Sequence, residues 1–212
     1  MALVVFCGLA GAASGAAGAF LLARLRRGTH VHSGWLAGAV AVLWVVVAWR
    51  VASGQLPVWW LPVPLVLTWF AVLLAVVDAR HARLPDALTL PAYPALAAAT
   101  VVAACLGDDW AITVRAALGG AVYLTLHLLV HLARPASLGA GDVKLSGSVG
   151  LTLAAAGWPA LALAAVVAAV GTLLLGAAMT ADGRREGIPH GPGLLTATCL
   201  FTIFPPGLFR GV

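Results

Sequence analysis

Charged residues are scarce in this chain of 212 amino acids. Lysine, arginine, aspartate and glutamate together make up 9% of it, whereas 62% is hydrophobic and the mean hydropathy is +1.04. A soluble domain is about one quarter charged, because charged side chains form much of its hydrated surface. The composition therefore excludes a water-soluble globule and indicates a membrane protein.

Cysteine is also sparse, and histidine is not arranged in a metal-binding pattern. The chain has three cysteines, each alone in an apolar stretch, so neither a disulfide framework nor a structural zinc site is expected. The histidine pairs His30/His32 and His127/His131 are not joined to a third ligand by spacing, and no H-E-x-x-H motif occurs. We expect no metal and no cofactor.

Long apolar runs dominate the rest of the sequence. They are apolar on every side, which excludes the alternation of a membrane barrel, and most approach the 20 or so residues that span a bilayer as a helix. The sequence thus predicts an all-α, polytopic membrane helical bundle with about eight transmembrane helices in a single domain, residues 1–212. Because the sixth run is short and precedes Gly157-Trp158-Pro159, a seven-span arrangement with one kinked segment stays open. The eight runs cover 2–23, 34–52, 57–77, 86–106, 110–133, 144–156, 158–180 and 192–207.

The basic residues indicate how the bundle is oriented. The first run is followed, not preceded, by arginines, so we expect its N-terminus outside and the connections 24–33, 78–85, 134–143 and 181–191 in the cytoplasm. The basic residues that give the formal charge of +5 form no stripe, so the expected partner is a lipid bilayer and not nucleic acid. Nine of the 12 basic residues lie in or beside these connections: Arg24, Arg26, Arg27, Arg80, Arg83, Arg134, Lys144, Arg184 and Arg185.

Two of the seven acidic residues fall where hydrocarbon meets the predicted cytoplasmic face. Asp78 ends the third run, and Asp142 closes the segment Gly139-Ala140-Gly141-Asp142 just before the sixth. A carboxylate at this depth is costly and is seldom kept without a use. Because glycine lacks a Cβ, Gly139 and Gly141 are expected to allow positive φ and close backbone approach, and so to aim Asp142 inward.

Structural explanations compete with a functional one at these acids. Asp78 alone is equally well explained as a charge that stops a helix beside Arg80. Asp86 follows Pro85 at the start of the fourth run, where its carboxylate would cap the helix.

Three segments resemble the type IV prepilin peptidase family. Residues 78–90 resemble its first aspartate segment, and residues 84–91, Leu-Pro-Asp-Ala-Leu-Thr-Leu-Pro, match that segment's second part closely. Residues 139–145, Gly-Ala-Gly-Asp-Val-Lys-Leu, are similar to the family's GxGDxKL segment, and residues 188–192 resemble its Ile-Pro-x-Gly-Pro loop before the last helix. The resemblance extends over most of the chain from about residue 60.

The resemblance implies a membrane aspartic endopeptidase that removes the basic leader peptide from prepilin or pseudopilin precursors at the cytoplasmic membrane boundary. Its catalytic pair maps onto Asp78 and Asp142, whereas Asp86 matches a position not usually assigned the chemistry. Two carboxyl groups brought close together cannot both ionise easily, so one would act as base on a water and the other as acid. Lys144 is either an electrostatic neighbour of this pair or an orientation signal at a helix end.

One departure from the family puts methylation in doubt, and three alternative functions stay open. Many relatives carry a cytoplasmic domain with paired C-x-x-C motifs between their first two helices and also N-methylate the new amino terminus; here that connection is short and contains no cysteine, which puts methylation in doubt. The alternatives are a proton- or ion-coupled transporter, a related GxGD intramembrane protease with another substrate, and an inactive subunit of a secretion complex. The sequence does not indicate an oligomeric state.

Overall fold

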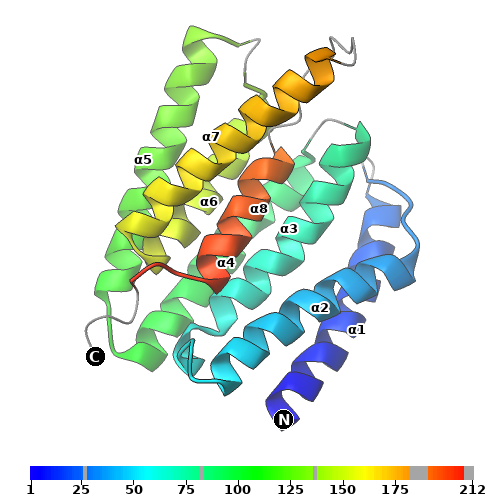
Figure 1. Ribbon diagram of the computed structural model, residues 1–212, viewed down its shortest axis with the longest axis vertical. Helices are drawn as coiled ribbons and strands as arrows, with labels where there is room; N and C mark the ends of the chain where they lie inside the picture. Colours follow the sequence, from blue (N-terminus) through cyan, green and yellow to red (C-terminus); the bar gives the residue numbers. More distant parts are fainter. Residues whose placement is uncertain (26–27, 82–83, 136–137, 182–190, 208–212) are drawn as a thin grey trace.

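The computed structural model describes residues 1–25, 28–81, 84–135, 138–181 and 191–207, and over these residues the fold is all-helical, as predicted (Figure 1). Arginines 26, 27, 83, 184, 185 and 210, and residues 188–190 of the third resembling segment, lie outside the described residues. The helices are α1 (Ala2–Arg24), α2 (Ser33–Ala52), a 3-10 helix η1 (Val58–Trp60), α3 (Pro62–His81), α4 (Asp86–Gly107), α5 (Ala111–Ala133), α6 (Ala140–Ala156), α7 (Trp158–Ala181) and α8 (Gly191–Ile203).

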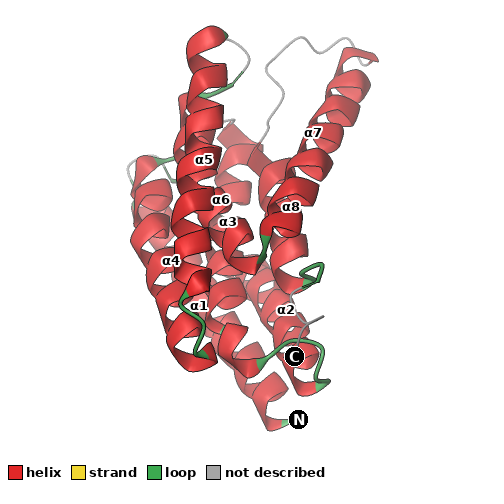
Figure 2. Ribbon diagram, turned by 90° about the vertical axis from the view of Figure 1, so that its left-hand side faces the viewer, coloured by secondary structure: helices red, strands yellow, loops and turns green. Residues whose placement is uncertain are grey.

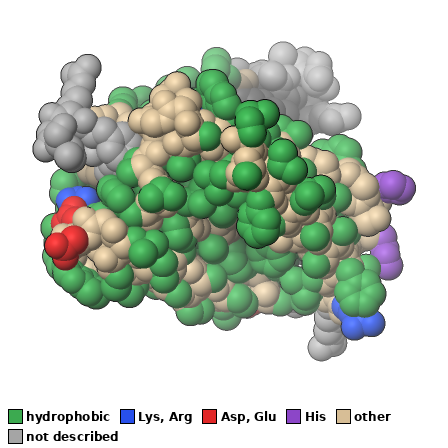
Figure 3. Space-filling view, turned by 90° about the horizontal axis from the view of Figure 1, so that it is seen from below, with side chains coloured by type: hydrophobic (Ala, Val, Ile, Leu, Met, Phe, Trp, Pro, Cys, Tyr) green, Lys and Arg blue, Asp and Glu red, His purple; other side chains and the backbone are tan. Residues whose placement is uncertain are grey.

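Several of these helices are of the membrane-spanning type. In the described part of the chain, five segments are long and apolar enough to cross a bilayer: Ala2–Arg24, Ser33–Ala52, Val58–His81, Asp86–Gly107 and Ala111–Ala133. The apolar parts of α7 and α8, Trp158–Leu174 and Gly193–Ile203, are shorter. Seen from below, the molecule presents mainly hydrophobic side chains with few charges (Figure 3). The structure thus has the surface of a membrane protein, while the count of about eight spans and the outside N-terminus stay predictions.

Two helices begin at residues other than the starts of the apolar runs in the sequence. The third run begins as the short helix η1, and α3 starts only at Pro62, because proline lacks an N–H and fits the first turn of an α-helix. The sixth helix starts at Ala140 instead of residue 144, with Gly139 as its N-cap, so Asp142 lies inside its first turn. At the other end of α6, Gly157 has a φ of +135°, and α6 and α7 are separate helices instead of one kinked segment.

Helices α3 and α6 form the centre of the bundle. Every residue of α6 from Leu145 to Gly150 is buried, and α3 packs against α2, α4 and α8. Close contact between α5 and α6 depends on glycine, since a Cβ on Gly150 would lie 2.6 Å from the carbonyl oxygen of Gly119. Buried Leu74, Leu145 and Leu194 belong to the same core and join α3, α6 and α8.

The ends of these central helices meet at one end of the molecule. The C-terminal end of α3 and the N-terminal ends of α6 and α8 lie toward the upper end in Figure 1, opposite the N-terminus, and Figure 2 shows the same separation from the side. Chain segments far apart in sequence are thereby brought together at the end that carries Asp78 and Asp142.

Candidate active site

Asp78 lies in the last turn of α3, directly after buried Val77. Its side chain is on the buried face of the helix, and the residue is 6% exposed. The Oδ2 atom is buried and has no hydrogen-bond partner among the described residues. A buried carboxyl group without such a partner lowers the stability of a fold. Packing therefore does not explain why an acid occupies this position.

Asp142 is held by the start of α6. It is the third residue of the helix, its N–H donates to the carbonyl oxygen of Gly139 at 3.1 Å, and its carboxylate lies beside the backbone of Gly139. An acid in the first turn is favoured by the helix dipole, and its reach back to the N-cap resembles half of a capping box. The Gly-Ala-Gly-Asp segment is thus a helix start that fixes the position of one carboxylate.

The two glycines of this segment have ordinary backbone angles, and their contribution is to allow close packing. Gly139 has a φ of −68° and Gly141 is helical, so the expectation of positive φ is wrong. Close approach is what the structure uses, because a Cβ on Gly141 would lie 3.1 Å from the Cβ of Leu84. Gly141 lets the first turn of α6 pack against the segment that leads into α4.

Gly191, the first residue of α8, lies where the two acids meet. A Cβ at this position would be 2.5 Å from Oδ2 of Asp78 and 3.7 Å from Oδ1 of Asp142. The Asp78 and Asp142 oxygens are therefore separated by at most the sum of these two distances. A single water molecule hydrogen-bonded to both oxygens would span about that length. The structure therefore brings Asp78 and Asp142 together, from α3 and α6, beside the start of α8.

Sequence reasoning did not assign a role to Gly191. Gly191 belongs to the segment 188–192, which resembles the family's Ile-Pro-x-Gly-Pro loop, but the resemblance gives this glycine no role. Its importance comes from the packing of α8 against α3 and α6, which brings it to two acids from other parts of the chain.

Asp86 and Lys144 form an ion pair beside this site. The Lys144 Nζ donates to Oδ1 of Asp86 at 2.7 Å and to Oδ2 at 2.9 Å, with the two side chains 44% and 56% exposed. The N-cap of α4 is Pro85, so the interpretation of Asp86 as a capping residue is wrong. The Tyr93 hydroxyl also donates to the carbonyl oxygen of Lys144. These contacts tie the start of α4 to the start of α6 and engage Lys144 with Asp86.

The histidine pair on α5 contacts backbone. His127 Nδ1 lies 2.9 Å from the carbonyl oxygen of Tyr123, and His131 Nδ1 lies 2.8 Å from that of Leu138. Among the residues that the structure describes, no three or more histidine, cysteine, aspartate or glutamate side chains form a group able to hold a metal ion. The expectation of a site without metal or cofactor stays a prediction.

A comparison with protein families decides the class of the protein. The sequence profile of the type IV leader peptidase family matches residues 65–177, more than half of the chain. The chain belongs to the type IV leader peptidase family. The match includes Asp78, Asp86 and Asp142 and ends before Gly191. No curated protein and no solved structure matches the chain. Membership of the type IV leader peptidase family favours a peptidase over the transporter.

Proposed function

We propose that this type IV leader peptidase family member is an aspartic endopeptidase that removes the leader peptide from prepilin or pseudopilin precursors. Asp78 and Asp142 are its catalytic residues, and the reaction takes place at the cytoplasmic boundary of the inner membrane. The observation that carries the proposal is the meeting of the two carboxyl groups around Gly191. Membership of the leader peptidase family supports the reaction class.

The helix ends around the two acids support a different role for each. Asp142 lies at the N-terminal end of α6, where the partial positive charge of the helix dipole favours an anion. Asp78 lies at the C-terminal end of α3, where the dipole is negative. Asp142 is accordingly the charged base that takes a proton from the attacking water. Asp78 holds the shared proton and donates a hydrogen bond to the carbonyl oxygen of the scissile peptide.

The depth of the pair fits a substrate that has one membrane helix. Asp78 is three residues from the end of the segment Val58–His81, which is long enough to span a bilayer. A precursor whose apolar helix lies in the bilayer and whose leader stays in the cytoplasm presents its junction at the same depth. The water attacks this peptide carbonyl, the C–N bond breaks, and a proton passes to the departing amine, so no acyl-enzyme forms.

Mass spectrometry of precursor amino termini tests this function. We expect prepilin-like precursors expressed with the wild-type chain to lose the leader at one position, and to keep it when the chain is absent. The same spectra reveal whether the new amino terminus carries a methyl group. Precursors that keep their leader in the presence of well-inserted wild-type protein would contradict the proposed substrate class.

The Asp86–Lys144 pair is expected to support cleavage without taking part in it. Asp86→Asn should lower the cleavage rate by about two- to fivefold, since a half-exposed ion pair contributes about 0.2–1 kcal/mol. The exchange Asp86→Lys with Lys144→Asp should recover most of the rate, as a double-mutant cycle on initial cleavage rates would measure. Asp109→Asn is the matched control, because Asp109 is 46% exposed and pairs with Arg115. A complete loss of cleavage in Asp86→Asn would contradict a supporting role.

A further inference from the structure

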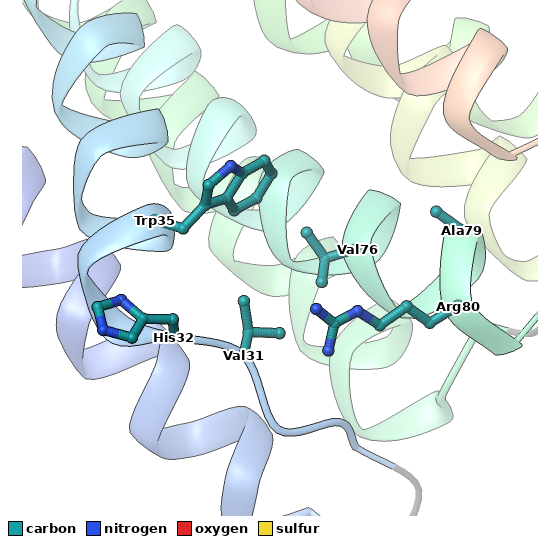
Figure 4. Close-up of a pocket in the computed structure, with 6 residues that line it drawn as sticks. All are labelled: Val31, His32, Trp35, Val76, Ala79 and Arg80. Atoms are coloured by element: carbon teal, nitrogen blue, oxygen red, sulfur yellow. The ribbon is translucent and has the colours of Figure 1, made fainter.

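A second feature at the same end of the molecule is a pocket of about 390 Å³ between α2 and α3. Residues three and four apart on a helix share one face, so Val76, Ala79 and Arg80 line the pocket from one face of α3. Asp78, two positions after Val76, lies on a different face. Figure 4 shows the lining side chains, three from the start of α2 and the segment before it and three from the last turns of α3. They are Val31, His32, Trp35, Val76, Ala79 and Arg80.

Arg80 gives this pocket a fixed positive charge. Its Nη1 donates to Oγ1 of Thr29 at 3.3 Å and to the carbonyl oxygen of His30, and these bonds hold the guanidinium in place. Figure 4 shows the side chain reaching from α3 toward Val31. Within the described ranges no carboxylate forms an ion pair with Arg80. Because a guanidinium has five N–H donors, several are left for a ligand.

His32 forms one edge of the pocket. Its Nδ1 accepts a hydrogen bond from the backbone N–H of Gly34 at 3.2 Å, which caps α2. With Nδ1 acting as acceptor, the hydrogen of a neutral imidazole is on Nε2. Figure 4 shows the ring on the far side of Val31 from Arg80, so His32 forms the rim of the pocket while its Nδ1 caps the helix.

The position of the pocket at the ends of two candidate spans fits the depth of lipid headgroups. Arg80 is the next-to-last residue of the candidate span Val58–His81, and Trp35 is the third residue of the span Ser33–Ala52. Trp35 is 59% exposed, as is usual for tryptophan at a membrane interface. The other walls, Val31, Val76 and Ala79, are apolar. A charged group beside an apolar wall at this depth suits a molecule with a phosphate and a hydrocarbon part.

We propose that this pocket binds an anionic phospholipid from the surrounding leaflet. Arg80 binds the headgroup phosphate with its free N–H donors, and Trp35 packs against the glycerol and the first carbons of the acyl chains. The charge of Arg80 selects anionic over zwitterionic headgroups. This lipid site does not depend on the peptidase activity proposed above.

Native mass spectrometry of the whole protein tests the proposal. The protein is reconstituted in nanodiscs of equal parts phosphatidylglycerol and phosphatidylcholine. It is then released from the nanodiscs in the mass spectrometer, and the ratio of phosphatidylglycerol to phosphatidylcholine that stays bound to it is measured. We expect phosphatidylglycerol to predominate in wild type and Arg80→Gln to lower the ratio about tenfold, the effect of losing a charge-assisted contact to a bound phosphate. Arg24→Gln is the matched control, because it removes a charge at the end of a candidate span but outside the pocket, and it should lower the ratio clearly less; an equal fall in both variants would overturn the proposal. Arg24 ends α1, and its guanidinium lies 3.9 Å from the centre of the Phe20 ring.

A second variant keeps the test decisive if Arg80→Gln disturbs folding through the loss of its two hydrogen bonds. His32→Asp retains an acceptor for the Gly34 N–H, because aspartate is a good N-cap residue, but it places a negative charge at the pocket. We expect it to lower the phosphatidylglycerol ratio as well. An unchanged ratio in His32→Asp, or in folded Arg80→Gln, would overturn the proposal.

Inorganic phosphate distinguishes a lipid from a soluble anion. Added to the protein in phosphatidylcholine nanodiscs, phosphate alone is expected to leave the thermal midpoint of unfolding unchanged. A rise in that midpoint that disappears in Arg80→Gln would show that the pocket binds a soluble phosphate, and the assignment to a lipid would fall.

Discussion

Asp78→Asn and Asp142→Asn are each expected to lower the rate of precursor cleavage by about 10³-fold or more. The proposed reaction needs one carboxyl group as base and one as acid, and removing either role loses a proton transfer worth about 10²–10⁴-fold. Asparagine is close in size to aspartate but can neither take nor supply a proton. The measurement is the initial rate of leader removal in membranes that contain equal amounts of each variant.

Stability measurements separate a catalytic role from a structural one. Because Oδ2 of Asp78 is buried without a hydrogen-bond partner among the described residues, Asp78→Asn should leave the thermal midpoint of unfolding unchanged or raise it. Asp142→Asn should lower it slightly, since the charge on the first turn of α6 is lost. Asp108→Asn, in the turn between α4 and α5, is the control for cleavage. Full cleavage by the Asp142 variant would reject the pair.

The helical architecture follows from the apolar runs, whereas helix starts depend on single residues. Hydropathy places the body of each described helix, because a helix that spans a bilayer needs about 20 predominantly apolar residues in a row. It does not place the start of α6, since Gly139, Ala140, Gly141 and Asp142 interrupt the apolar pattern. That start is favoured by the acid in the first turn, whose carboxylate lies beside the N-cap Gly139, a local interaction that hydropathy does not contain.

The acids of the proposed site stand out in the sequence, whereas their contacts do not. Asp78 and Asp142 stand out because a carboxyl group at the edge of an apolar run is costly. Asp86 had a sufficient local explanation as a helix cap, and only the packing of α4 against α6 shows that it pairs with Lys144. Likewise, the place of Gly191 depends on three helices that meet at one end of the bundle.

Gly191→Ala is expected to lower cleavage by about 10²-fold or more, a typical effect of displacing a catalytic group by about 1 Å. The new methyl group would lie 2.5 Å from Oδ2 of Asp78 and 3.2 Å from its Cγ, so the carboxyl group must move away from its present position. It would also occupy part of the space between Asp78 and Asp142 in which the attacking water is proposed to bind. The measurement is again the initial rate of leader removal.

The fold should tolerate this change, because the atoms in conflict are the end of one side chain and not backbone. Gly193→Ala is the matched control on the same helix, since a Cβ there would be 3.9 Å from the carbonyl oxygen of Ala168 and from Oγ1 of Thr172, both ordinary contacts. Both variants should therefore unfold near the wild-type temperature, while only Gly191→Ala loses cleavage. Equal activity in the two variants would mean that the space between the carboxyl groups is not where the peptide bond is hydrolysed.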